Sequence, residues 1–72
     1  MNLQIQFGLR VKELRLKTGL SQEALAFKAG IDRTYMTGVE NGKRNVSVKN
    51  IEKIIKSLEL PISEFFSSKL FE

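Results

Sequence analysis

Glycines that are followed two residues later by a helix-capping residue divide the centre of this chain into short helices. Gly19 precedes Ser21, and Gly30 precedes Asp32. Glycine favours the left-handed backbone just beyond a helix, whereas Ser and Asp favour the position that begins one. The centre of the chain can therefore build only short helices joined by tight turns.

Within each segment the apolar residues recur at helical spacing. This spacing predicts five helices, the last capped by Ser63, over about residues 4–18, 22–29, 33–41, 48–58 and 62–71. The buried stripes are expected to include Leu3 in the first helix and Val48 in the fourth. No segment shows the period of two that is typical of a strand. The predicted fold class is all-α, a compact five-helix domain over residues 1–72.

Cysteine and histidine are absent from the 72 residues. Disulfides, thiol nucleophiles and Ser-His-Asp triads are therefore excluded within the chain, and a zinc site made only of carboxylates would be unusual. We expect neither an enzyme nor a bound cofactor or metal. Because a core this small supplies only about 3–5 kcal/mol, we expect very good helix packing or self-association to stabilise the domain.

The positive charge lies in the body of the chain rather than at its end. Residues 10–56 hold eleven basic and five acidic residues, a charge of +6, whereas residues 57–72 hold one Lys and three Glu, a charge of −2. A basic body suggests a polyanionic partner. No apolar run reaches the roughly 18–20 residues that span a bilayer, and the first ten residues are no signal peptide. We expect a cytoplasmic protein with no membrane partner.

Residues 22–41 form the most informative stretch, two predicted helices joined by the turn Gly30-Ile31-Asp32. A turn this tight sets the helices at a steep angle, so that the second can enter a DNA major groove. Its inward positions are taken by Met36 and Val39. The outer face then presents Arg33, Thr34, Tyr35, Thr37, Gly38 and Asn41. Arg can donate two hydrogen bonds to guanine, and Thr can bond a base or touch the thymine methyl group.

Two residues of this outer face have a second interpretation. Tyr35 is either a base reader or a half-buried core ring with its hydroxyl in solvent. Gly38 allows either close helix packing or a close approach of the backbone to DNA, at a cost of about 1 kcal/mol against alanine. The residues alone leave both choices open.

The pattern Gln22, Ala26, Gly30-Ile31 and Glu40-Asn41-Gly42 resembles the phage repressor and Cro type of helix-turn-helix domain. More narrowly, residues 32–40 with Arg44-Asn45 resemble the controller proteins of bacterial restriction–modification systems. The resemblance implies a sequence-specific, dimeric, DNA-binding transcription regulator without enzymatic activity. Such a controller activates and represses its own promoter and that of the endonuclease.

The resemblance also implies roles for individual residues. Base reading falls to Arg33, Thr34, Tyr35 and Thr37, and backbone contact to Gln22, Asn41, Lys43, Arg44 and Asn45. Arg15 and Glu40 match an ion pair that joins the first and third helices, with phosphate contact by Arg15 as the second interpretation. Glu23 matches a contact with RNA polymerase, whereas its position alone suggests an acid that stabilises the helix start.

The end of the chain carries more apolar groups than a surface turn can hide, so we expect residues 50–71 to contain a dimer interface. The residues predicted to form it are Ile55, Leu58, Ile62, Phe65 and Phe66. A two-fold dimer would place two recognition helices about 34 Å apart, on a near-palindromic operator. Whether dimers then form tetramers on DNA stays open.

Two other functions stay open at this point. One is a plain repressor or the antitoxin of a toxin–antitoxin pair, which the neighbouring genes would distinguish from a controller. The other is a protein-interaction module that has the fold but does not bind DNA, because fold alone does not settle function. The cluster of Arg33, Tyr35, Lys43 and Arg44 speaks against that module.

Overall fold

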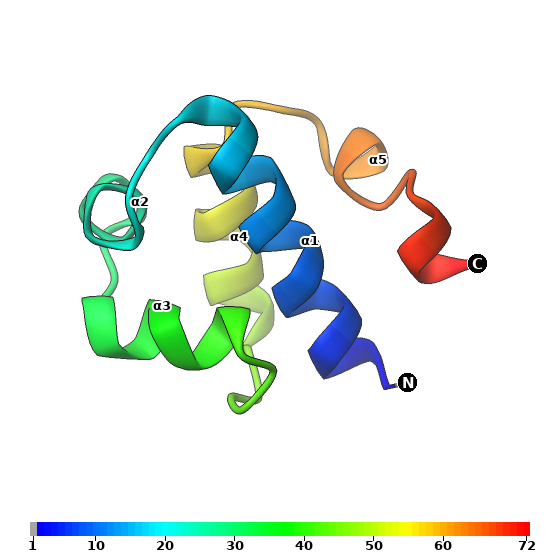
Figure 1. The fold of residues 1–72 in the computed structure, drawn as a ribbon, viewed down its shortest axis with the longest axis horizontal. Coiled ribbons are helices and arrows are strands. Elements are labelled where there is room, and N and C mark those ends of the chain that lie inside the picture. Colours follow the sequence, from blue (N-terminus) through cyan, green and yellow to red (C-terminus); the bar gives the residue numbers. More distant parts are fainter. Residues whose placement is uncertain (1) are drawn as a thin grey trace.

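The computed structural model describes residues 2–72, and all of its regular elements are helical (Figure 1). The α-helices are α1 (Leu3–Thr18), α2 (Gln22–Ala29), α3 (Arg33–Glu40), α4 (Val48–Ser57) and α5 (Ile62–Phe65). A short 3₁₀ helix, η1 (Lys69–Phe71), follows α5. The described part of the chain contains no strand, so the prediction of an all-α domain is confirmed.

Three of the four capping residues expected from the sequence begin their helices as predicted. The side chains of Ser21, Asp32 and Ser47 each accept a hydrogen bond from a backbone N–H in the first turn that follows. Gly19 and Gly30 end α1 and α2 with φ values of 78° and 72°, the left-handed conformation that glycine adopts without strain. These local signals fix where α2 and α3 begin, and so fix the turn between them.

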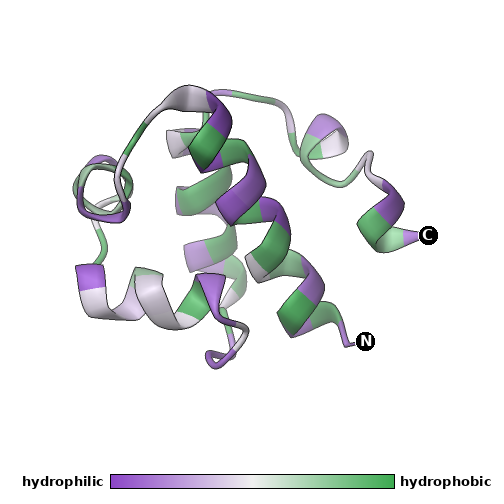
Figure 2. Ribbon diagram, viewed as in Figure 1, coloured by the Kyte–Doolittle hydropathy of each residue, from purple (hydrophilic) through white to green (hydrophobic). Residues whose placement is uncertain are grey.

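The core lies between α1 and α4, with α2 and α3 on one side and α5 on the other (Figure 1). Figure 2 shows green hydrophobic bands along α1 and α4, whereas most of α3 is pale or purple. The largest fully buried side chains are Val11, Leu25, Met36, Val39, Ile54, Ile55 and Phe65. The helices α1 to α4 thus each pack an apolar face into this core, and α5 contributes Phe65 alone.

The approach of α1 to α3 depends on a glycine that the sequence did not single out. A Cβ atom built on Gly8 would lie only 2.1 Å from the carbonyl oxygen of Val39. Because that neighbour is backbone, a side chain at this position would force the two helices apart. Gly8 therefore lets α1 support α3 from behind.

Arg10 joins α1 to the end of α5. Its Nε donates to the carbonyl oxygen of Phe65 at 2.7 Å, and its Nη2 donates to that of Glu64 at 3.0 Å. Nη1 forms an ion pair with Glu13 at 2.9 Å. Only 8% of the Arg10 surface is exposed. Since a buried guanidinium must find acceptors, this residue fixes the position of α5 on the bundle.

A second link ties α2 to the connection between α4 and α5. The ammonium of Lys28 pairs with the carboxylate of Glu59, which has a left-handed φ of 59°. The hydrogen bond from Lys28 and then its charge lower the pKa of Glu59. Both side chains are open to solvent, at 42% and 74% exposed, so this pair adds little to stability.

Three details of the predicted helices are wrong. The segment 62–71 is not one helix, because Ser68 adopts an extended backbone and caps η1 separately from α5. Ser63 lies inside α5, which begins after Pro61 without a side-chain cap. Leu3 and Val48, expected on buried stripes, are 63% and 84% exposed because they lie in the first turns of their helices, beyond the edge of the core.

Three of the five residues of the predicted dimer interface are enclosed within the single chain. Ile55, Leu58 and Phe65 are at most 6% exposed, because the chain's own helices enclose them. They therefore present little surface to a second copy. Ile62, at 58% exposed, and Phe66, which is half-buried, stay accessible from the predicted set.

Candidate nucleic-acid interface

The turn between α2 and α3 is built so that α3 lies at the edge of the molecule (Figure 1). The backbone N–H of Ile31 donates to the carbonyl oxygen of Ala26 at 3.0 Å, which closes the turn after Gly30. Met36 and Val39 are at most 1% exposed and hold the inner side of α3 against the core. The opposite side of α3 is left uncovered within the described chain.

We call this uncovered surface the reading face, and define it by residues of α3 and the loop that follows. Its members are Arg33, Thr34, Tyr35, Thr37, Asn41, Lys43, Arg44 and Asn45. Tyr35 and Thr37 are half-buried, and the other six are exposed. The one acid in this stretch, Glu40, is buried and paired with Arg15. The reading face therefore presents three cations without a competing carboxylate, an arrangement that suits a polyanion.

Tyr35, Gly38 and Arg44 form one unit on this face. The guanidinium carbon of Arg44 lies 5.5 Å from the centre of the Tyr35 ring, a cation–π contact. A Cβ atom on Gly38 would lie 2.7 Å from Cγ of Arg44, so the side chain of Arg44 occupies the space beside Gly38. The sequence left the role of Gly38 open; the structure shows that its missing side chain makes room for Arg44.

The buried ion pair of Arg15 and Glu40 joins α1 to α3, the helix that carries part of the reading face. Nε and Nη2 of Arg15 donate to the two carboxylate oxygens of Glu40 at 2.6 and 3.0 Å. Nη1 of Arg15 donates to the carbonyl oxygen of Leu20 at 2.8 Å. The side chain of Glu40 has no exposed surface. The predicted pair is thus present and uses two donor atoms of Arg15, while the third donates to Leu20, so all three are occupied inside the chain.

Gln22 extends this network from α2 to α3. Its Nε2 donates to Oε1 of Glu40 at 3.0 Å, and its Oε1 accepts from the hydroxyl of Thr37 at 2.9 Å. The network connects a residue predicted to contact phosphate with one predicted to read bases. The sequence pattern did not indicate this contact, because it joins positions fifteen residues apart across the turn.

Metal sites and membrane-spanning helices are not found between Asn2 and Glu72. That range contains no group of three or more side chains that could hold a metal ion. None of its helices is both long enough and apolar enough to cross a membrane. Glu23, the predicted polymerase contact, is exposed in the first turn of α2.

Residues 11–65 match the model of the helix-turn-helix family. The matched range includes α2, the turn and α3, and it extends from within α1 to the end of α5. The chain belongs to the helix-turn-helix family.

Within that family the chain is similar to restriction–modification controller proteins. Control protein C.MunI of Mycoplasma sp is 51% identical over 67 residues, which cover 92% of this chain and 90% of the relative. The crystal structure of the controller C.AhdI from Aeromonas hydrophila is 51% identical, with a TM-score of 0.83 over 88% of this chain and 96% of that one. The controller C.Esp1396I, solved as a tetramer on its natural 35-base-pair operator, is 39% identical, with a TM-score of 0.87 over 92% and 87% of the two chains.

Proposed function

We propose that this chain is a dimeric, sequence-specific, DNA-binding transcription regulator that controls a restriction–modification system. The reading face carries the proposal, because it combines an uncovered helix surface with three cations and no exposed acid. The similarity to controllers, one of them solved on operator DNA, supports the same function. An interaction module without DNA binding would have no need for such a surface.

In the proposed complex, α3 enters the major groove and the flanking residues hold the phosphates. Arg33 and Thr34 are exposed at the start of α3, where recognition helices meet base edges. Asn41 and Lys43 lie at the other end of α3 and in the loop, in reach of the backbone. Phosphate contacts set the register of the protein, and base contacts set its sequence preference.

Selection of bound fragments from random duplexes tests this function. The expected product is a near-palindromic sequence whose half-sites are about 34 Å apart, one turn of B-DNA. Affinity for it is expected to fall steeply as salt concentration rises, because phosphate contacts release counterions. A chain that enriches no sequence, or whose duplex affinity does not depend on salt, would contradict the proposal.

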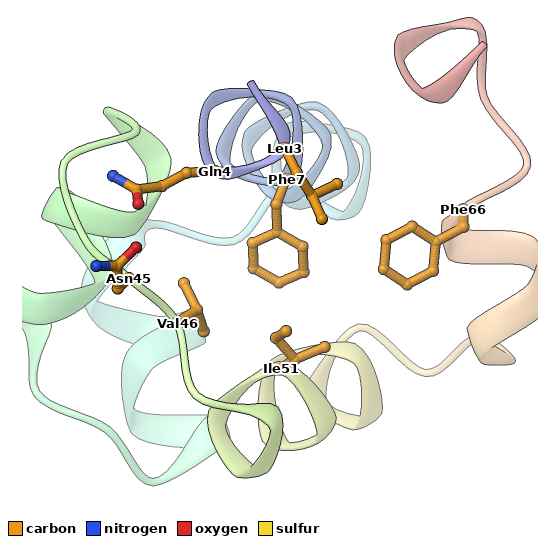
Figure 3. Close-up of a pocket in the computed structure, with 7 residues that line it drawn as sticks. All are labelled: Leu3, Gln4, Phe7, Asn45, Val46, Ile51 and Phe66. Carbon is orange, nitrogen blue, oxygen red and sulfur yellow. The ribbon is translucent and has the colours of Figure 1, made fainter. Parts of the chain in front are cut away.

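The proposed dimer keeps the predicted region and centres on its accessible apolar residues, Ile62 and Phe66. An apolar pocket of about 240 Å³ lies between α1, α4 and the end of α5. Figure 3 shows Phe7 and Leu3 of α1 opposite Ile51 of α4 and Phe66. Ile62 is exposed four residues before Phe66, one turn earlier along the same segment. We assign a second copy of the chain to this surface. An exposed apolar area next to an open apolar pocket is the kind of feature that a symmetric partner covers.

Glu23 is the proposed contact with RNA polymerase. It is exposed in the first turn of α2, so a second protein can reach it. Glu23→Lys is expected to keep operator affinity and lose activation in transcription from a controlled promoter. Unchanged activation would leave Glu23 as a residue that only stabilises the helix start.

A further inference from the structure

We infer that Thr37 presents a hydrogen-bond acceptor to DNA and thereby recognises the exocyclic amino group of adenine or cytosine. The inference rests on the proposed function and adds the chemistry of one base contact to it. It follows from the direction of the hydrogen bonds that run from Glu40 through Gln22 to Thr37.

The direction is set at Glu40. Its side chain is fully buried, and its carboxylate receives two hydrogen bonds from Arg15 at 2.6 and 3.0 Å. A carboxylate in such a pair only accepts hydrogen bonds. The Gln22 atom 3.0 Å from Glu40 Oε1 must therefore be the amide nitrogen, which donates. The two ends of the Gln22 amide are thereby distinguished chemically.

The amide oxygen of Gln22 consequently faces Thr37, 2.9 Å from its hydroxyl. The carbonyl oxygen of Arg33 is the other neighbour of that hydroxyl, at 3.1 Å. Both neighbours can only accept, and a threonine hydroxyl has a single proton to donate. Whichever acceptor takes it, the proton stays inside the protein. The Thr37 oxygen is left with lone pairs for an outside donor.

The major groove offers such a donor on only two of the four bases. Adenine N6 and cytosine N4 donate, whereas guanine O6 and N7 and thymine O4 accept. To donate to a keto oxygen, the Thr37 hydroxyl would have to give up its internal hydrogen bond and leave Gln22 Oε1 or the Arg33 carbonyl without it. Adenine or cytosine is therefore favoured at the base pair that Thr37 meets.

The test removes single amino groups from the selected operator. Each adenine in a half-site is replaced by purine, and each cytosine by 2-pyrimidinone, and affinity is measured for the unmodified protein, T37V and T37S. Thr37→Val keeps the shape but removes the hydroxyl, and Thr37→Ser keeps the hydroxyl. At one position per half-site, we expect removal of the amino group to lower the operator affinity of the unmodified protein and of T37S by about three- to tenfold. The affinity of T37V should be the same with and without that amino group.

Two results would overturn the inference while sequence preference itself persists. In one, no amino-group removal weakens operator binding by the unmodified protein more than it weakens binding by T37V. In the other, the position that loses discrimination in T37V carries guanine or thymine, which would make Thr37 a donor. The amino-group scan of the unmodified protein decides even if T37V folds poorly. A protein without any sequence preference would overturn the proposed function, and the inference with it.

Discussion

Glu40 is the residue on which the position of α3 depends most directly. Its carboxylate is fully buried and neutralises Arg15, which is itself only 8% exposed. We expect Glu40→Ala to lower the free energy of unfolding by about 3–5 kcal/mol, because it leaves a buried guanidinium without its counter-charge. Urea unfolding measures the change. The matched control is Glu52→Ala, which removes an exposed carboxylate and should stay within about 0.5 kcal/mol of the parent. A loss of the same small size in both variants would contradict the prediction.

Arg33 and Lys43 are both exposed cations of the reading face, but we expect their substitution to affect DNA binding in different ways. Arg33→Ala should cost about 1–3 kcal/mol of binding free energy and relax the preference at one base position. Lys43→Ala should weaken all duplexes alike and reduce the salt slope by about one. Fluorescence titrations of the selected operator and a scrambled duplex at several salt concentrations separate the two. Equal weakening of every duplex by Arg33→Ala would make Arg33 a phosphate contact.

Sequence patterns identified residues whose roles are tied to position along a helix, and missed those that depend on folding. The Arg15–Glu40 pair is implied by the resemblance to repressor-type domains, and the outward position of Arg33 by the helical spacing of Met36 and Val39. The contact of Arg44 with Tyr35 depends on the path of the loop after Gly42, which no periodicity describes. The bond from Gln22 to Thr37 needs the crossing geometry of two helices. Both were therefore visible only in three dimensions.

At the scale of elements, α5 is the helix least able to stand alone. It has four residues, and no side chain caps its start. Its last carbonyls are held by Arg10. We expect Arg10→Met to cost about 1.5–3 kcal/mol, since two hydrogen bonds from a charged donor are lost. Hydrogen exchange should show protection lost for amides in and after α5, while those of α2 and α3 keep theirs.

Lys12→Met is the matched control for that change, because Lys12 is an exposed cation two residues away on the same helix. It should leave the exchange pattern unaltered. Equal loss of protection throughout the chain in the Arg10 variant would show that α5 does not open separately. The bundle would then unfold as a single unit.

The boundaries of the first four helices could be predicted because each carries its own signal, a capping residue at the start or a glycine at the end. The last segment could not, since its apolar residues suit one helix while Ser68 breaks it. Likewise, the need for glycine at position 8 arises from the carbonyl of Val39 on another helix. Local propensity does not register such contacts between elements.

For the whole molecule, assembly is the property that the apolar surface around Ile62 predicts. Ile62→Asp places a charge on that surface and should weaken dimerisation at least about tenfold, the effect of losing a central interface residue. Leu16→Asp is the control, because Leu16 is 60% exposed against 58% for Ile62 but lies in the last turn of α1, whereas Leu3 and Phe7 of the proposed surface lie in its first two turns. Sedimentation equilibrium compares the two. Dimers that persist in the Ile62 variant, or are lost only in the Leu16 variant, would place the interface elsewhere.

Glu40 touches partners from both other elements that support the reading face, Arg15 of α1 and Gln22 of α2, while itself belonging to α3. The chain has no cysteine to form a disulfide, and the Glu40 carboxylate instead connects α1, α2 and α3 through its hydrogen bonds. Any molecule that loses the bundle also loses the alignment of the side chains of the reading face. Heat or denaturant should therefore abolish operator recognition and helicity at the same midpoint, leaving no half-folded species able to occupy a promoter.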